Sequence, residues 1–327
     1  MKPAVLVARA VFPQVLAQLA EHFEVTSNPL DVAWTQPELI RQLQGRQGVL
    51  TTGSERIDAA LLAACPELKI CANMAVGFNN FDLGAMTAAG VLGTNTPDVL
   101  TETTADFGFA LLLATARRIT EAEQFLRAGR WHRWRYDLLA GVDVHGRTLG
   151  ILGLGRIGQG IAKRAAHGFG MPVIYHNRHP LDATTEAACG ARWVSKTALL
   201  QQCDHLMLVL PYSAEVHHCI GAAELAQMKP TATLVNIARG GIVDDAALAS
   251  ALRQGTIAAA GLDVFEGEPA VHPDLLTLPN VVLTPHIASA TLPTRLAMAE
   301  LAAANLLGFL LHGKPVTPLN PDVLSAS

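Results

Sequence analysis

The stretch LGILGLGRIG, residues 149–158, decides the fold of this chain of 327 residues. A short apolar run, Leu149–Leu152, leads into the pattern G-x-G-x-x-G formed by Gly153, Gly155 and Gly158, and a helical pattern follows directly. The first glycine permits a tight turn, the second lets the backbone approach a diphosphate, and the third lets the helix pack on the strand. With a strand before it and a helix after it, this turn predicts dinucleotide binding at a helix N-terminus.

The end of the next strand indicates which dinucleotide is bound. Val173–His176 runs into Asn177, Arg178 and His179. An acidic residue here would hydrogen-bond the ribose hydroxyls and repel a 2′-phosphate, whereas Asn177 is neutral and Arg178 can pair with a phosphate. A solvated surface arginine is the alternative. We therefore expect NADPH as the cofactor, with NADH as a weaker one.

Strands and helices alternate on both sides of the turn, which is typical of parallel α/β sheets. Before the turn, the expected strands are Ala4–Ala8, Gly48–Thr51, Ile70–Ala75 and Val91–Gly93, with helices at Pro13–His22, Gln36–Gln44 and Ala59–Ala64. A long helix is expected from Glu102 to about Arg127, with its charges in the order that suits the helix dipole.

The second series predicts six strands, at Leu149–Leu152, Val173–His176, His205–Leu210, Thr233–Ile237, Ala259–Val264 and Val281–Thr284. Helices are expected at Gly158–Gly168 and Asp245–Gln254, and a last amphipathic helix at Pro293–His312. The fold class is therefore α/β, with two doubly wound parallel-sheet domains, Rossmann-like or flavodoxin-like.

Composition excludes several classes of protein. Half of the residues are hydrophobic, so disorder is excluded as the main state, and the net charge of −4 argues against a nucleic-acid binder. The longest apolar stretches, Phe107–Ala116 and Leu301–Leu311, are about half the ~20 residues of a membrane span. The start of the chain reads as a buried strand rather than a signal peptide. We expect a cytoplasmic protein with no membrane partner.

The cysteines and one histidine pair bear on metals and disulfides. Five cysteines form no CxxC motif, which favours reduced thiols in the cytosol. The sequence His217-His218-Cys219 looks metal-like. Because adjacent side chains ordinarily diverge and no partner pair has a suitable spacing, we predict no metal.

Three strand ends of the second series carry unusual polar residues, and the carboxyl ends of parallel strands form the ligand site of an open sheet. These residues are Arg239, Glu268 and His286. Arg239 suits a substrate carboxylate and the keto oxygen beside it, and His286 suits a proton donor that Glu268 would orient. With a hydride from the dinucleotide, this set can reduce a 2-keto acid. Asp263 is a candidate for holding the nicotinamide end.

Collinear motifs over most of the chain resemble the D-isomer-specific 2-hydroxyacid dehydrogenases. They are Val76–Asp82, Gly153–Gly158, Val235–Gly240, Asp263–Pro269 and Thr284–Ile287. Within the family, Thr101–Asp106, His167–Pro172 and the Asn177-Arg178 pair are similar to the bacterial branch of glyoxylate/hydroxypyruvate and 2-ketogluconate reductases.

The resemblance implies Arg239, Glu268 and His286 as catalytic residues, and the N–H groups of Val76 and Gly77 with Arg239 and His286 on the substrate. It implies a discontinuous substrate domain of residues 1–100 plus 290–327, and a cofactor domain of residues 101–289. The implied cofactor contacts are Thr104, Gly153, Leu154, Gly155, Arg156, Ile157, Gly158, Asn177, Arg178, His179, Leu210, Pro211, Ile237, Ala238, Arg239, Asp263, His286 and Ala288.

The stretch Trp131–Tyr136 interleaves aromatic and basic residues. A nucleic-acid surface conflicts with the net negative charge, and such residues are enriched at protein interfaces. The resemblance implies a homodimer built on this region, with an aromatic residue reaching the neighbouring active site.

Two other functions compete with reduction of small 2-keto acids by NADPH. One is an NAD-linked dehydrogenase with another substrate, which the neutral Asn177 disfavours. The other is a non-enzymatic NAD(H)-sensing corepressor, which would not need the set Arg239, Glu268 and His286.

Overall fold

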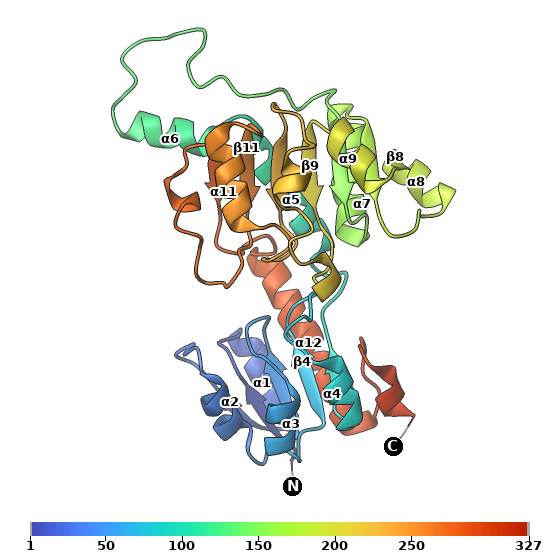
Figure 1. Cartoon of the computed structure of the whole chain (residues 1–327). Helices are drawn as coiled ribbons and strands as arrows, with labels where there is room; N and C mark the ends of the chain where they lie inside the picture. The colour runs from blue at the N-terminus through green and yellow to red at the C-terminus, as the bar shows by residue number, and fades with distance from the viewer. Residues whose placement is uncertain (1, 326–327) are drawn as a thin grey trace. The chain divides into compact units, whose positions relative to one another are not determined.

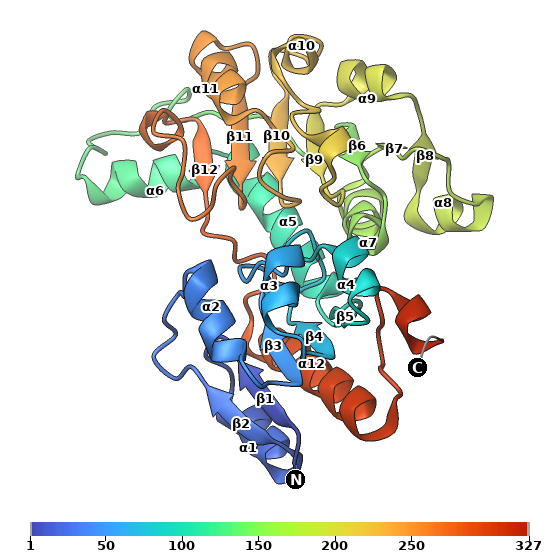
Figure 2. The ribbon, with the colours of Figure 1, turned by 60° about the horizontal axis from the view of Figure 1, so that its bottom comes forward.

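The computed structural model describes residues 2–325, and the chain divides into two compact units. Unit 1 is formed by Met1–Leu100 together with Ala290–Ser327, and unit 2 is Thr101–Ser289. Unit 1 is therefore discontinuous in sequence. Figures 1 and 2 show the elements of each unit.

Within the described part of unit 1, five parallel strands form one sheet in the order β2-β1-β3-β4-β5. The strands are β1 (Ala4–Val7), β2 (Glu24–Ser27), β3 (Gly48–Thr51), β4 (Ile70–Asn73) and β5 (Leu92–Thr94). The helices are α1 (Pro13–His22), α2 (Gln36–Leu43), α3 (Ala59–Ala64), α4 (Leu83–Ala88) and α12 (Leu292–His312). Side-chain caps fix several helix starts: the Asp58 carboxylate, for example, accepts a hydrogen bond from the N–H of Leu61 in α3.

Helices cover both faces of this sheet. On one face, Leu19 of α1 and Leu306 of α12 belong to a core with Val5 and Leu50. On the other face, α2, α3 and α4 pack against alternate strand residues such as Leu6. Because both faces are buried, the inner strands read as continuous apolar runs.

Seven parallel strands of the described residues form the sheet of unit 2, in the order β12-β11-β10-β9-β6-β7-β8, which can be followed in Figure 2. The strands are β6 (Leu149–Leu152), β7 (Val173–His176), β8 (Ala191–Trp193), β9 (His205–Leu208), β10 (Thr233–Asn236), β11 (Ala259–Leu262) and β12 (Val281–Leu283). The α-helices are α5 (Thr101–Ala116), α6 (Ile119–Arg127), α7 (Arg156–Lys163), α8 (Ala183–Cys189), α9 (Lys196–Gln202), α10 (Ala222–Leu225) and α11 (Asp245–Gln254).

This second sheet is also covered on both faces. Side chains of α9, α10 and α11 pack with Leu206, Leu234 and Leu262 in one core. Side chains of α5 and α7 pack with Ile151 and Val235 in the other. The prediction of two parallel-sheet α/β domains is therefore confirmed, and each sheet has one strand more than expected.

The two unpredicted strands lie at sheet edges. β2 has the sequence EVTS and β8 the sequence ARW, and each pairs with a single neighbour. Edge strands do not need the continuous apolar run of an inner parallel strand, so their sequences give little signal.

The prediction of one long helix from Glu102 to about Arg127 is wrong. α5 ends at Ala116, and α6 begins at Ile119 after Arg118, which has a φ of 54° in the left-handed region. The carbonyl of Ala116 accepts a hydrogen bond from the N–H of Val142 instead of continuing the helix. The predicted helix Gly158–Gly168 is also divided, into α7 and a π-helical turn at Arg164–Gly168.

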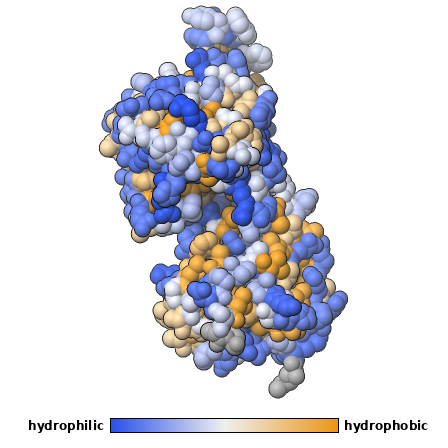
Figure 3. Space-filling view, turned by 90° about the vertical axis from the view of Figure 1, so that its right-hand side faces the viewer, coloured by the Kyte–Doolittle hydropathy of each residue, from blue (hydrophilic) through white to orange (hydrophobic). Residues whose placement is uncertain are grey.

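α12 is the one helix of the described residues that is long and apolar enough to cross a membrane, by length and composition alone. Its residues Ala299, Ala302 and Leu306 are buried in the core of unit 1, however. α12 therefore has the packing of a core helix. On the face shown in Figure 3, hydrophilic residues are interspersed among the hydrophobic ones of each unit.

Candidate active site

The turn between β6 and α7 has a backbone geometry suited to binding the diphosphate of a dinucleotide. Gly153 has a φ of +100°, and a Cβ there would lie 2.8 Å from the Cα of Leu210. A Cβ on Gly158 would lie 2.6 Å from the carbonyl oxygen of Gly153, whereas one on Gly155 would meet nothing within 4 Å. Packing within the turn therefore requires two of the glycines, and the third leaves open space beside the backbone.

The residues around the start of α7 suit a diphosphate. Gly155 is the N-cap, and no side chain in the described part of the chain caps this helix. The N–H groups of a first helical turn have no partner within the helix and favour an anion. Oδ1 of Asn177 accepts a hydrogen bond from the N–H of Leu154 at 2.7 Å, so Asn177 holds the turn in place. Arg178 and His179 follow it and are exposed.

The other predicted cofactor contacts also lie in unit 2. Leu210 packs against Gly153, Pro211 follows it, and Ile237 and Ala238 come directly after β10. The hydroxyl of Thr104, on α5, is buried without a hydrogen-bond partner among residues 2–325. A buried hydroxyl of this kind is stabilised when a bound group supplies the missing partner. These residues fit a dinucleotide.

Three chemically active side chains stand at the carboxyl edge of the same sheet. Arg239, Glu268 and His286 follow β10, β11 and β12, which are neighbours in the sheet. Nδ1 of His286 lies 2.7 Å from Oε2 of Glu268, and Oε1 of Glu268 accepts a hydrogen bond from the N–H of Phe265 at 2.9 Å. Nη1 of Arg239 donates to the carbonyl of Ala238 at 2.7 Å. A cation, a carboxylate and an imidazole are thus held at one edge.

The charges of this set are coupled. Burial alone would raise the pKa of Glu268. Three other groups hold this pKa below its usual range: the imidazole of His286 by its hydrogen bond and charge, the N–H of Phe265, and the charge of Arg239. Burial lowers the pKa of Arg239, and the charge of Glu268 opposes that effect. Glu268 is therefore ionised at neutral pH and available to orient the imidazole.

The comparisons with known proteins agree with this geometry. The NAD binding domain of the D-isomer specific 2-hydroxyacid dehydrogenases matches residues 109–288. The chain is 47% identical over 329 residues to the glyoxylate reductase of Thermococcus onnurineus (strain NA1), covering 99% of this chain and 98% of that protein. The chain belongs to the D-isomer-specific 2-hydroxyacid dehydrogenase family.

Other members of the family match over similar lengths. The glyoxylate/hydroxypyruvate reductase B of Yersinia pestis (strain Pestoides F) is 44% identical over 325 residues, covering 99% of both proteins. The NADPH-dependent glyoxylate/hydroxypyruvate reductase of Sinorhizobium meliloti, solved in complex with NADP and malonate, superposes with a TM-score of 0.88. It is 38% identical, and the match covers 98% of this chain and 97% of that one.

The structure shows a role for Asp263 that the sequence did not indicate. Its buried carboxylate accepts hydrogen bonds from the hydroxyl of Thr284 at 2.7 Å and from the N–H groups of Ile287 and Ala288, each at 2.9 Å. His286 itself has a φ of 53°, in the left-handed region that a side chain rarely adopts. Asp263 therefore fixes the strained turn that carries the imidazole of this dehydrogenase. Its predicted contact with the nicotinamide stays a prediction.

The predicted carboxylate-binding loop of the family lies in unit 1, after β4. Nδ2 of Asn95 donates to the carbonyl of Val76 at 2.8 Å, and Nδ2 of Asn73 donates to the carbonyl of Gly77 at 2.9 Å. Among residues 2–325, the N–H groups of Val76 and Gly77 have no acceptor. Two amide side chains thus fix the loop while its N–H groups stay available for an anion.

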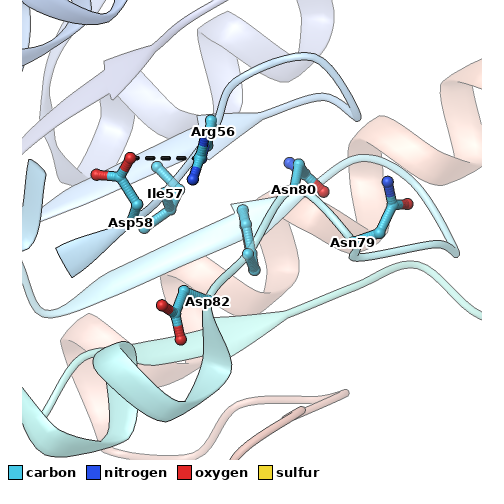
Figure 4. Close-up of a pocket in the computed structure, with 7 residues that line it drawn as sticks. Arg56, Ile57, Asp58, Asn79, Asn80 and Asp82 are labelled. Carbon is cyan, nitrogen blue, oxygen red and sulfur yellow. Dashed lines mark ion pairs between the residues drawn. The ribbon is translucent and has the colours of Figure 1, made fainter. Parts of the chain in front are cut away.

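A hollow of about 410 Å³ adjoins the same loop (Figure 4). Arg56 and Asp58, paired at 3.4 Å, line it together with Asn79–Asp82. Neither Val76 nor Gly77 lines this hollow. It is therefore distinct from the predicted substrate contacts.

The prediction that His217 and His218 diverge is wrong. Their rings stack with centroids 3.9 Å apart and an interplanar angle of 21°. The cause is the backbone of His218, whose φ of 50° lies in the left-handed region. Sequence reasoning also missed Glu266, whose carboxylate lies beside both rings.

Proposed function

We propose that this protein reduces small 2-keto acids, glyoxylate and hydroxypyruvate first among them, to D-2-hydroxy acids with NADPH. The observation that carries the proposal is the 2.7 Å contact between His286 and Glu268 at the sheet edge that also bears Arg239. Two relatives that match almost the whole chain are a glyoxylate reductase and a glyoxylate/hydroxypyruvate reductase B, which supports these two substrates. 2-Ketogluconate is a further candidate from the resemblance.

Each residue of the set has a distinct role in this reaction. Arg239 binds the substrate carboxylate and polarises the keto oxygen. The family resemblance implies the N–H groups of Val76 and Gly77 as further donors to the carboxylate. When bound, the dinucleotide supplies a hydride to the keto carbon.

The proton goes to the developing alkoxide. Nδ1 of His286 is engaged by Glu268, so Nε2 is the nitrogen that donates the proton. The carboxylate of Glu268 fixes the orientation of the ring for this transfer. Hydride on carbon and proton on oxygen together give the hydroxy acid.

The proposed preference for NADPH over NADH is argued from the residues that follow β7. Asn177 is occupied in holding the glycine turn, and Arg178 is exposed beside it, with no acidic residue at either position to repel a 2′-phosphate. Loss of one charge-assisted hydrogen bond corresponds to about a tenfold change in affinity. We expect Arg178→Ala to raise KM for NADPH about tenfold and to leave KM for NADH unchanged.

A steady-state panel tests the function as a whole. Glyoxylate, hydroxypyruvate, 2-ketogluconate and pyruvate are each offered with NADPH and with NADH. Turnover of the first two with NADPH supports the proposal. Absence of turnover with all four would favour the corepressor alternative, and a preference for NADH would remove the argument from Arg178.

We further propose a cytoplasmic homodimer that uses the segment Trp131–Tyr136. Trp131, Trp134 and Tyr136 are 56%, 77% and 88% exposed, and exposed large aromatic residues close together in sequence are typical of a protein interface. They lie on the long connection between α6 and β6 in Figure 1. The five free cysteines of the chain agree with a reducing compartment. Trp134→Ala with unchanged mass in solution and unchanged kinetics would contradict this role.

A further inference from the structure

Two histidines and a glutamate form a cluster that the proposed reaction does not use. His217 and His218 lie on the loop after β9, and Glu266 lies on the loop after β11. One nitrogen from each ring and one oxygen of the carboxylate all lie within 4.8 Å of one another. We propose that His217, His218 and Glu266 form a binding site for a divalent transition-metal ion, of which Zn²⁺ is the best match.

Two of the ligand separations bracket those around a tetrahedral ion, and the stacked rings must rotate to meet it. Nε2 of His218 lies 2.7 Å from Oε2 of Glu266, and Nε2 of His217 lies 3.8 Å from Oε1. Ligand atoms around tetrahedral zinc are about 3.4 Å apart, between these two values. The three side chains are 42%, 37% and 44% exposed, so the stacked rings have room to rotate until the lone pairs of both Nε2 atoms point at one ion. A nitrogen that binds the ion must be unprotonated, so binding is expected to release a proton where Nε2 of His218 carries one.

The backbone holds the two adjacent rings together. His218 has a φ of 50°, and its N–H donates a hydrogen bond to the carbonyl of Gly241 at 2.7 Å. A non-glycine residue in this region is strained and persists only where its surroundings hold it there. The strain turns both imidazoles to the same side of the loop, where Glu266 lies.

An oxygen lies near the second nitrogen of each histidine, and for His217 it is within hydrogen-bond distance. Nδ1 of His217 lies 3.1 Å from the hydroxyl of Tyr212, and Nδ1 of His218 lies 4.0 Å from Oδ2 of Asp244. Histidines that bind metals usually donate their other N–H to such an oxygen, which leaves the lone pair of Nε2 for the ion. The surroundings of His217 therefore match those of a metal-binding histidine.

The donor set defines the class of ion. Two imidazole nitrogens with one carboxylate oxygen prefer zinc, nickel and copper to magnesium and calcium, which prefer oxygen ligands. Three protein ligands leave a fourth position for water. The ion would join two loops of unit 2, one of which also carries Glu268 two residues after Glu266. We therefore expect bound Zn²⁺ to raise the Tm of the protein.

Metal titration of the full-length protein tests the site. Protein stripped with a chelator is titrated with Zn²⁺ by calorimetry, and with Co²⁺ by visible absorption, which reports tetrahedral coordination. We expect one tight Zn²⁺ per chain with proton release. The double variant His217→Ala/His218→Ala and the single variant Glu266→Gln should each weaken binding at least about tenfold.

Two further variants separate this site from general surface binding. Tyr212→Phe removes an outer partner alone, so it should weaken Zn²⁺ binding by less than Glu266→Gln does. His312→Ala removes an exposed histidine of unit 1 and should leave the affinity unchanged. Circular dichroism of the metal-free variants confirms folding. Unchanged Zn²⁺ affinity in the double variant or in Glu266→Gln, no Zn²⁺ bound by the natural chain, or equally tight Mg²⁺ binding would each overturn the proposal.

Discussion

The glycine turn after β6 and the polar edge after β10, β11 and β12 belong to one sheet, yet they are specified in different ways. The turn is fixed by backbone contacts, since a Cβ on Gly153 or Gly158 would collide with the main chain. The polar edge is assembled from side chains that are far apart in sequence, such as Glu268 and His286. The proposed cofactor binding thus depends on local main-chain geometry, and the proposed proton transfer depends on strand order.

The largest effect should come from removing the cation of the polar edge. Arg239→Ala eliminates both the partner of the substrate carboxylate and the charge beside the keto oxygen. We expect kcat/KM for glyoxylate with NADPH to fall about 10³-fold, the upper range for loss of one group that stabilises developing negative charge. Steady-state kinetics provides the measurement.

Binding of the dinucleotide is the control for Arg239→Ala, because the glycine turn is untouched. Arg239 is itself among the implied cofactor contacts, so the affinity for NADPH, measured by fluorescence titration, should fall by about tenfold at most, the effect of one lost charge-assisted hydrogen bond and far less than the loss of kcat/KM. If cofactor affinity and kcat/KM fell by the same factor, the glycine turn and the polar edge would not act independently, which would contradict the comparison.

Two glycines of the turn form a matched pair that sharpens the comparison. Gly153→Ala puts a methyl group 2.8 Å from the Cα of Leu210 at a φ of +100°, so it should cost about 1–3 kcal/mol of folding free energy. Gly155→Ala meets only open space and should fold normally. Its methyl group faces the expected diphosphate, and KM for NADPH should rise about tenfold.

Thermal unfolding and NADPH kinetics of the two alanine variants check this pair. We assign a packing role to Gly153 and a role in the approach of the diphosphate to Gly155. A loss of stability in Gly155→Ala with normal stability in Gly153→Ala would contradict this assignment.

The smallest effect concerns the pH dependence of stability. The pKa of Glu268 is held below its usual range, so the folded state favours the ionised carboxylate. Its contribution to stability is present above the ordinary glutamate pKa and is lost as the pH falls through the lowered value. The natural chain should therefore exceed Glu268→Gln in Tm by on the order of 2 °C at neutral pH, and the difference should shrink in acid.

Calorimetric melting of both proteins over the acid range gives the comparison. A Tm difference that grows as the pH falls would contradict the lowered pKa of Glu268.

The inner strands and the glycine turn could be predicted because their signals are local. A buried parallel strand is a continuous apolar run, and the spacing of Gly153, Gly155 and Gly158 is visible in ten residues. The placement of the candidate residues after β10, β11 and β12 at one sheet edge could likewise be predicted from their positions at strand ends, and their role in the reaction stays a prediction.

Features set by distant partners were not predictable in the same way. The break at Arg118 depends on a hydrogen bond from Val142 to the carbonyl of Ala116, which the helical pattern does not show. The stacking of His217 on His218 depends on a left-handed backbone at His218. Asp263 holds three groups of the His286 turn, a task that only the folded chain reveals.

The kcat of His286→Gln at neutral pH tests the central claim most directly. Glutamine fills a similar volume and forms hydrogen bonds, but it cannot release a proton near neutral pH. With glyoxylate and NADPH, we predict that kcat falls about 10²-fold or more, while the affinity for NADPH, of which His286 is an implied contact, falls by no more than about tenfold. An unchanged kcat would remove His286 from the reaction and contradict the account.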